Sequence, residues 1–337
     1  MLVEQKEFLT PEAGITTQGR TFIDLANGKR TFGLSFVFRQ VATVTVAALT
    51  AIRNRGSLLS QFTKIGINDN GKDIVNIDTR SAGILGNVHS GQTFPSTRLA
   101  TPVAVYNLEE TVYMPLANPL SVSPSETAFS ERNPNTRLRA FVTWVPDNTQ
   151  IANVGPATLV LGTPTVTVVQ HYDDDRGSVP SKLSPFWREI VTSVPNANAT
   201  LRALLDSTLR LRGILLQQDT NIGEVTDILA NGFRLLSAQR VFYGPGQIAY
   251  AELQRDAIRE FGGDFGAAAG YLYLNFQRNG RLAEVINQAR NAQLRFEFNA
   301  IPSVTGGATS SNIRITPLEL EEIPGLTLPP ERWGFVA

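Results

Sequence analysis

The residues best suited to acid–base chemistry in this chain are its two histidines, His89 and His171. In a Ser-His-Asp triad, the histidine takes the proton from a serine hydroxyl while a carboxylate holds the ring in place. His89 lies in the polar stretch NVHSG, and His171 lies in VQHYDDD. Polar neighbours of this kind favour a solvent-exposed histidine, so we expect neither residue to be catalytic.

Acidic residues occur close together at three places, and paired carboxylates are what a glycosidase uses as acid and base. These groups are Glu109 and Glu110, Asp173 to Asp175, and Glu319, Glu321 and Glu322. A glycosidase needs two carboxyl groups that face each other, whereas adjacent residues of a strand point to opposite faces. We therefore expect Glu109 and Glu110 to lie at a hairpin tip, and we expect no enzymatic activity.

Two clusters of oxygen-bearing side chains could supply ligands to Ca²⁺, which prefers carboxylate and carbonyl oxygens. They are NDNGKD at 68–73 and the three aspartates at 173–175. The first lacks the closing glutamate of an EF-hand, so a hairpin turn is favoured there, and a solvated linker is favoured for the second. We expect no cofactor, and we leave open a Ca²⁺ ion between subunits.

The remaining composition excludes several classes of site. The chain has no cysteine, which rules out disulfides, thiolate nucleophiles and cysteine-based zinc sites. Neither a G-x-x-x-x-G-K-[ST] loop nor a G-x-G-x-x-G loop is present to bind phosphate. The 337 residues include 30 basic and 30 acidic side chains, and this balance argues against a broadly basic, nucleic-acid-binding surface.

Two segments bear on where the protein is found. The N-terminus has no basic region followed by an apolar core, so it does not resemble a secretory signal. The most apolar run, at 41–52, is shorter than the roughly 20 residues that span a bilayer, and its β-branched residues favour a buried strand. We therefore expect a protein that is made in the cytoplasm and not secreted.

Most of the chain has the pattern of short strands separated by Gly, Pro and Asn turns, with little helix. The expected parts are an N-terminal arm at 1–31, a first β domain at 32–172, a linker at 173–198, a second β domain at 199–323, and a tail at 324–337. Asn70-Gly71, between alternating apolar residues, predicts a hairpin. A helix is predicted at 246–262, where apolar residues recur on one face.

The two β domains can be aligned by the order of their expected strands. The matched segments are FVFRQVATVTV with STLRLRGILLQ, TKIGINDNG with FRLLSAQR, TPVAVYNLEETVYMPL with GYLYLNFQRNGRL, TRLRAFVTW with AQLRFEFNA, and TPTVTVVQHY with SNIRITPLEL. Matched segments lie about 150 to 170 positions apart, far more than the about 20–50 residues of a solenoid repeat. We infer a tandem duplication of one antiparallel sandwich; the alternative is two unrelated β domains with similar spacing.

A second feature is the segment GYLYLNFQRNGRLAEVINQARNAQLRFEFNAI followed by NIRITPLELEEI, in a cysteine-free chain with an N-terminal arm. In this layout the sequence resembles the double jelly-roll major capsid proteins of tailless icosahedral, membrane-containing bacteriophages. The resemblance implies an all-β fold of two tandem antiparallel eight-stranded jelly rolls, with a short helix in the second and an extended N-terminal arm. It also implies a homotrimer whose six jelly rolls form a pseudo-hexagonal capsomer of an icosahedral shell.

The resemblance further implies which partners the protein has in the virion capsid. They are other copies of the chain, penton or minor capsid proteins, and an internal lipid membrane. Four aromatic residues are candidates for contacts between subunits: Trp187 and Trp333, which flank Pro-rich segments, and Phe8 and Phe22 in the expected arm. A carbohydrate- or receptor-binding β-sandwich protein, such as a virion spike or a lectin-like module, is the alternative function.

Overall fold

The chain folds into two compact units, the first formed by residues 1–117 and 128–180 and the second by residues 118–127 and 181–337. The computed structural model describes residues 6–15, 19–45, 58–90, 103–119, 121, 123–130, 137–145, 159–173, 181–194, 199–205, 208–220, 228, 230–238, 241–261, 270–291, 293–300 and 311–323.

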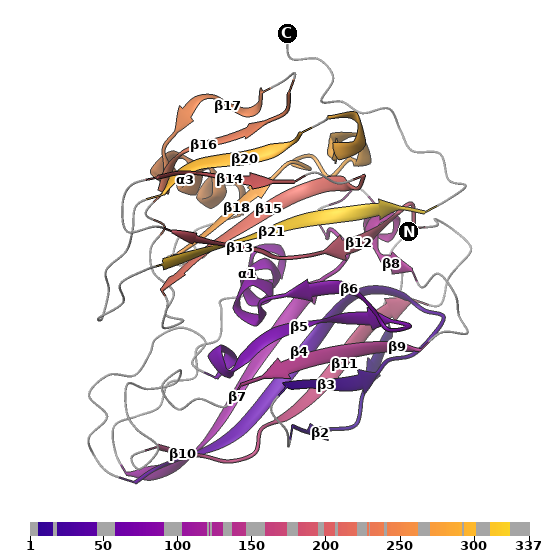
Figure 1. Cartoon of the computed structure of the whole chain (residues 1–337). Coiled ribbons are helices and arrows are strands. Elements are labelled where there is room, and N and C mark those ends of the chain that lie inside the picture. The colour runs from indigo at the N-terminus through magenta and orange to yellow at the C-terminus, as the bar shows by residue number, and fades with distance from the viewer. Residues whose placement is uncertain are drawn as a thin grey trace. The chain divides into compact units, whose positions relative to one another are not determined.

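The first unit contains a sheet of seven strands (Figure 1). They are β1 (Lys6–Leu9), β2 (Ala13–Gly14), β4 (Arg30–Val44), β7 (Ala104–Pro115), β8 (Phe129–Ser130), β10 (Leu159–Leu161) and β11 (Thr165–Asp173). The long β4 pairs antiparallel with β11 and β10 along one edge and with β7 and β8 along the other. Strands β1 and β2 pair with the far edge of β11 and lie at the outside of the sheet.

A second sheet of the first unit covers the same core. Its strands are β3 (Gly19–Asp24), β9 (Leu138–Trp144), β5 (Phe62–Asp69) and β6 (Lys72–Ile77), in the spatial order β3-β9-β5-β6. The predicted Asn70-Gly71 hairpin is confirmed, because these two residues join β5 to β6 with φ of 49° and 85°. Glycine adopts such positive φ values without steric cost, and asparagine tolerates them better than most residues.

Alternation along β4 accounts for the core of the first unit. Leu34, Phe36 and Phe38 are fully buried, while the intervening residues face away from the core, as the two-residue period of a strand requires. The ring of Phe38 stacks on Phe62 of β5 with 4.2 Å between centroids, so the two sheets meet through aromatic side chains.

The second unit also contains a sheet built around one long strand. Its strands are β12 (Leu183–Trp187), β13 (Ile190–Val194), β15 (Arg210–Thr220), β18 (Tyr271–Asn275), β19 (Ile286–Asn287) and β21 (Ser311–Glu322). β15 pairs with β21 along one edge and with β18 and β19 along the other. β12 and β13 pair with the far edge of β21.

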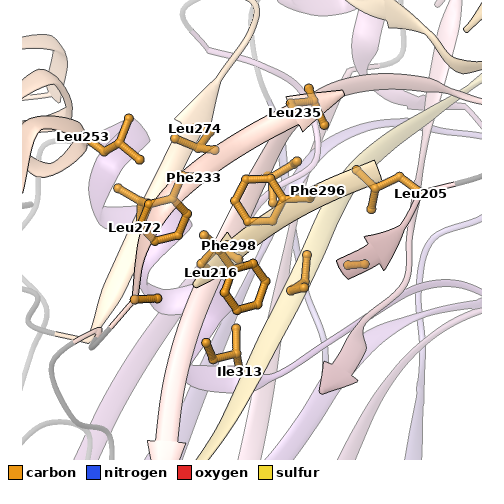
Figure 2. Packing of buried hydrophobic residues seen from close by; sticks show 14 of the residues in the cluster. Leu205, Leu216, Phe233, Leu235, Leu253, Leu272, Leu274, Phe296, Phe298 and Ile313 are labelled. Atoms are coloured by element: carbon orange, nitrogen blue, oxygen red, sulfur yellow. The ribbon is translucent and has the colours of Figure 1, made fainter. Parts of the chain in front are cut away.

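The other sheet of the second unit has the spatial order β14-β20-β16-β17. The bounds are β14 (Ala199–Leu204), β20 (Arg295–Ala300), β16 (Ala230–Leu236) and β17 (Val241–Ile248). Figure 2 shows the aromatic centre of this unit, where Phe233, Phe296 and Phe298 lie among leucines from both sheets. Their ring centroids are 5.6 to 6.1 Å apart, which is the range of favourable aromatic packing.

The two units have the same strand order. In the first unit, β11 pairs with β1 and β2 on one side and with β4 on the other, and β4 pairs in turn with β7 and β8. In the second unit, β21 pairs with β12 and β13 on one side and with β15 on the other, and β15 pairs in turn with β18 and β19. The other sheets read β3-β9-β5-β6 and β14-β20-β16-β17, again in matching chain order. All five segment pairs matched in the sequence occupy equivalent strands, so the prediction of two like antiparallel β domains in tandem is confirmed.

A β-bulge in β4 adds a detail of this repeat. Phe32 is the extra residue, because Gly33 lies opposite His171 while Thr31 lies opposite the next residue of β11. The carbonyl of Phe32 accepts hydrogen bonds from the N–H groups that follow β7, including that of Leu116 at 2.9 Å. The ring of Tyr113 on β7 covers Gly33 so closely that a Cβ there would lie 2.6 Å from it.

The second unit has the same bulge at the equivalent place. Arg212 is the extra residue of β15, immediately before Gly213, and its carbonyl accepts a 2.9 Å hydrogen bond from the N–H of Phe276. The ring of Tyr273 on β18 covers Gly213, where a Cβ would lie 2.9 Å from the ring. Bulge, glycine and tyrosine therefore recur together, which two unrelated sandwiches with similar strand spacing would not explain.

The described residues of each unit include one α-helix, of which only the second was predicted. α3 (Tyr250–Phe261) packs against β18 and has one exposed face, so its apolar residues recur with helical period. α1 (Thr79–Ser90) packs against β7 and is buried on nearly all sides, which removes that period from its sequence. Gly86 makes the approach possible, since a Cβ there would lie 2.2 Å from the carbonyl oxygen of Tyr113.

The compact units differ in extent from the expected domain ranges. Residues expected to form the arm contribute β1, β2 and β3 to the first unit, and residues expected to form the linker contribute β12 and β13 to the second. These strands are only two to six residues long, so they show much less of the apolar alternation that marks a long central strand. The tail at 324–337 lies outside the described residues.

Candidate assembly surfaces

The structure places the four predicted contact residues in different surroundings. Trp187 of β12 is only 1% exposed, and the guanidinium of Arg212 lies 5.6 Å from its ring centroid. It therefore anchors β12 inside the second unit and does not project outward. Phe8 and Phe22 are exposed, on the edge strands β1 and β3. Trp333 lies outside the described residues.

The outer face of the sheet that contains Phe22 has an aromatic row. Phe22 lies opposite Phe141 on β9, and Phe141 lies opposite Gly66 on β5. The guanidinium of Arg20 is 4.0 Å from the centroid of Phe141, and that of Arg139 is 4.2 Å from the centroid of Phe22. Cation–π stacking of this kind fixes both arginines on the surface.

The equivalent row in the second unit is ionic. Arg202 of β14, Glu297 of β20 and Arg234 of β16 lie opposite one another. The Nε atoms of Arg202 and Arg295 lie 2.8 and 2.9 Å from the Oε1 atom of Glu297, and an NH2 atom of Arg234 lies 3.7 Å from Oε2. Three guanidinium groups thus surround one carboxylate that is 5% exposed.

Sequence reasoning did not identify either row. The segments that carry them, LRAFV and LRFEF, belong to a pair of expected strands that were matched by their order in the chain. In a strand with a buried face, the alternate residues form the outward face. Arg295 and Glu297, which alternate with the buried Phe296 and Phe298, could have been found on that signal.

His171 makes an unexpected set of contacts on β11. Its Nε2 lies 2.8 Å from the Ser35 hydroxyl oxygen, and its Nδ1 lies 3.3 Å from Oε1 of Glu7. Burial lowers the pKa of the His171 imidazole, and the nearby Glu7 carboxylate partly offsets this effect. The edge of the Tyr113 ring also contacts it, with 5.5 Å between centroids.

This Ser-His-Glu arrangement resembles a triad only in its side chains. Ser35 is a central residue of β4 and is paired with both β11 and β7, so its backbone N–H belongs to the sheet ladder. Acyl transfer needs free N–H donors beside the nucleophile to stabilise the oxyanion, and Ser35 offers none of its own. His89 lies apart from this group, in the last turn of α1.

The paired carboxylates are engaged in structural contacts. Glu109 and Glu110 point to opposite faces of β7: Glu109 accepts a 2.6 Å hydrogen bond from Arg39, and the buried Glu110 accepts one from the N–H of Leu59. They lie within the long β7 rather than at a hairpin tip, as had been expected. Glu319 is buried and accepts hydrogen bonds from Arg188 and Gln288.

Asp173 and Arg30 form a clamp at the ends of β11 and β4. Their closest atoms are 2.6 Å apart, and both side chains are buried. In the second unit, Arg210 at the start of β15 makes the matching contact with Glu322 at the end of β21, also at 2.6 Å. The clamp ties the first long strand of each unit to its last strand.

The hairpin at 68–73 has its oxygens occupied by hydrogen-bond donors. Asp73 accepts from the side chains of Asn68, Asn76 and Arg20, at 2.8 to 3.3 Å. Among the described residues, no group of three or more His, Cys, Asp or Glu residues is arranged to hold a metal ion. Of the aspartates at 173–175, the second and third lie outside the described residues.

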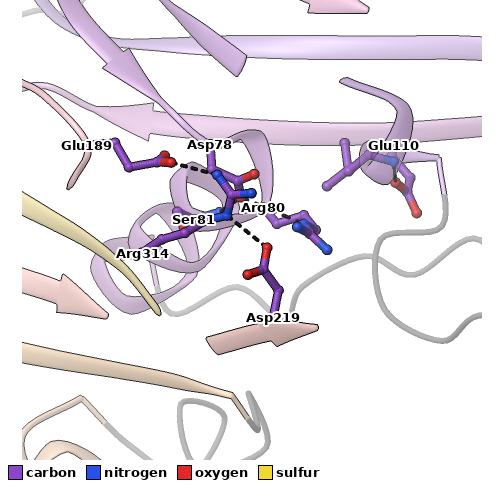
Figure 3. A network of polar contacts seen from close by, with 8 residues as sticks. Asp78, Arg80, Ser81, Glu110, Glu189, Asp219 and Arg314 are labelled. Carbon is purple, nitrogen blue, oxygen red and sulfur yellow. Dashed lines mark hydrogen bonds and ion pairs between the residues drawn. The ribbon is translucent and has the colours of Figure 1, made fainter. Parts of the chain in front are cut away.

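Figure 3 shows a buried polar network in each unit. In the second unit, Arg314 of β21 bridges Glu189 at 2.7 Å and Asp219 of β15 at 2.8 Å. In the first, Asp78 caps α1 by accepting a 3.1 Å hydrogen bond from the N–H of Ser81. These contacts pair buried charges and satisfy a helix end, which is structural work.

The part of the chain that the structure describes has no helix long and apolar enough to cross a bilayer. No protein-family model matches the sequence, and no curated protein matches it.

Several solved structures match the fold over nearly its whole length. The STIV major capsid protein aligns with a TM-score of 0.66 at 12% identity, covering 94% of this chain and 96% of that one. The fold is a double jelly roll. The major capsid protein of Bacteriophage PM2 aligns at 0.59 with 10% identity, covering 96% and 100%. The PBCV-1 virus capsid aligns at 0.60 with 9% identity, covering 94% of each chain.

Proposed function

We propose that this double jelly-roll protein is a major capsid protein without enzymatic activity, which assembles as a homotrimer into an icosahedral virion shell. The observation that carries the proposal is the full-length match: capsid proteins align with both jelly rolls in order, with little of either chain left over. A protein with one jelly roll and a catalytic or binding domain would not align over 94% or more of the chain.

The repeat described above supports a trimer on physical grounds. Two like β-sandwiches in one chain give pseudo-sixfold symmetry when three chains close by head-to-tail contacts. The arginine–carboxylate clamps and covering helices brace each sandwich without any bound group. We propose Phe8, Phe22 and Trp333 as contact residues between subunits, with penton or minor capsid proteins and an internal membrane as further partners in the virion.

The test is the assembly state of the purified protein. We expect mass photometry to give a stable trimer and electron microscopy to show pseudo-hexagonal particles, alone or joined into shells. A protein that stays monomeric at micromolar concentration and binds glycans on an array would contradict the proposal and favour the carbohydrate-binding alternative.

A further inference from the structure

The ionic row of the second unit has more positive than negative charge. Arg202, Arg234 and Arg295 contribute three guanidinium groups to one carboxylate, that of Glu297. Arg202 and Arg295 both use Nε to reach the same oxygen, so with respect to the described residues their terminal nitrogens remain available for a further carboxylate. The Arg202 side chain is 68% exposed, so an outside group can reach it.

A row of three aliphatic residues, with Arg295 between the first two, runs beside the row of Arg202, Glu297 and Arg234. Arg295 of β20 lies between Leu204 of β14 and Leu236 of β16. Leu236 lies opposite Val241 of β17. Leu204 and Val241 are exposed. The edge strand β14 thus presents an arginine and, two residues later, a leucine on the same outward face.

The edge strand β1 of the first unit presents the complementary pair. Glu7 and Leu9 lie opposite His171 and Val169 of β11, on the outward face of their sheet. The Glu7 side chain is 66% exposed, and Leu9 is 65% exposed. Burial lowers the pKa of His171, which disfavours the positive charge that would pair with the Glu7 carboxylate 3.3 Å away.

We propose that β1 of one copy of the chain lies against the outer face of β14, β20 and β16 of a second copy, with Glu7 among the three arginines and Leu9 against Leu204. The inference rests on the proposed self-assembly and assigns one of its contacts. Both strands carry a charged residue and a leucine at two-residue spacing, so the pairs can match in register. Because different patches meet, the contact is head-to-tail and can close into a ring.

The charge and shape of this face favour a second copy over other anionic partners. Three arginines around one glutamate leave a small net positive charge, whereas nucleic-acid binding depends on the neutralisation of many phosphates. Two exposed aliphatic side chains on a flat sheet give little to insert into a lipid bilayer. The edge strand β1 of a second copy can contact both rows, because Glu7 can pair with the arginines and Leu9 can pack against Leu204.

The experiment is a charge swap in the full chain. We expect E7R alone and R202E alone each to weaken the trimer about tenfold, measured by mass photometry after dilution or in graded urea. The double variant E7R/R202E should return to within about threefold of the unchanged protein, because the pair is restored with its charges exchanged. R259E, which reverses an exposed arginine of α3, is the matched control and should have no effect.

R202E places a second acid beside Glu297, so the neutral variants R202Q and E7Q are measured as well, with circular dichroism to verify folding. We expect each to weaken the trimer about threefold. If the trimer forms and none of these variants weakens it, this contact is wrong while the proposed function stands. Loss of binding to anionic vesicles in R202E with an unchanged trimer would also overturn it. A monomeric parent protein would instead contradict the proposed function.

Discussion

The two jelly rolls share the same local backbone features but carry different side chains on their outer faces. Each has the same bulge, followed by a glycine under a tyrosine ring, and each has a helix on the equivalent strand. The equivalent outer rows, however, are Phe22, Phe141 and Gly66 in the first unit and Arg202, Glu297 and Arg234 in the second. After a duplication, packing constrains the interior of both copies alike, whereas each outer face is free to adapt to its own neighbour.

The bulge residue itself illustrates the same contrast. Phe32 packs with Ala117 and Ala128 in a small apolar cluster of the first unit. Arg212, at the equivalent position, is fully buried, and burial lowers the pKa of its guanidinium while the hydroxyl of Tyr273 opposes that shift. The two bulge residues share the role of their backbone carbonyl, which accepts a hydrogen bond from the chain that follows β7 or β18. This role does not depend on the side chain, which differs between the two units.

The largest effect should come from Gly66→Ala in the aromatic row. A Cβ at Gly66 would lie 1.8 Å from the carbonyl oxygen of Val75 on β6, so the β5–β6 backbone must move. We expect a loss of about 3 kcal/mol in the free energy of unfolding, measured by urea denaturation. The control is Gly14→Ala, where nothing lies within 4 Å, and it should be nearly neutral. Equal effects of both variants would mean that this close approach does not constrain β5.

An intermediate effect should separate the two bulge glycines. At Gly213 a Cβ would lie 2.7 Å from the carbonyl oxygen of Leu274, a backbone atom, whereas at Gly33 the three nearest atoms all belong to the Tyr113 side chain. A side chain can change its rotamer more easily than a strand can shift. We therefore expect Gly213→Ala to lower the free energy of unfolding by about 2 kcal/mol and Gly33→Ala by about 1 kcal/mol. Thermal and urea unfolding of both variants test this order, and the reverse order would contradict the distinction between a backbone obstacle at Gly213 and a side-chain obstacle at Gly33.

The smallest effect should be a pH dependence confined to the first unit. Burial lowers the folded-state pKa of His171 below its ordinary 6.5, so below that pH the unfolded chain binds a proton more readily than the folded one. The contribution of neutral His171 to the free energy of unfolding is therefore fully present above pH 6.5, and it becomes smaller as the pH falls below that value. We expect His171→Gln to flatten the stability curve measured between about pH 7.5 and pH 5.5. A curve with unchanged slope would show that other groups dominate.

The sequence predicted the long central strands, the hairpin and the exposed helix, because each has a periodic or turn signal of its own. It did not predict α1, since a helix buried on nearly all sides has no polar face to reveal its period. Nor did it place β1, β2, β12 and β13 in sheets, since their pairing depends on a neighbouring strand rather than on their own residues.

The contact residues were harder to predict than the fold. Trp187 was expected to face a neighbouring subunit because it flanks a Pro-rich segment, yet its ring is 1% exposed and lies beside the guanidinium of Arg212. The arginines around Glu297 come from three strands that are remote in sequence, so no local motif links them. Only the pairing register brings them together.

One short segment of the first half has become part of the second jelly roll. Residues 118–127 belong to that unit, where Asn118 donates a 2.8 Å hydrogen bond to Gln277 and Ser121 donates one of 2.9 Å to the carbonyl of Gly280. Glu126 completes the attachment through Lys182. A single break in the polypeptide between the two units therefore cannot yield two intact halves, because the second jelly roll would lose a segment that the chain supplies before the first jelly roll is complete.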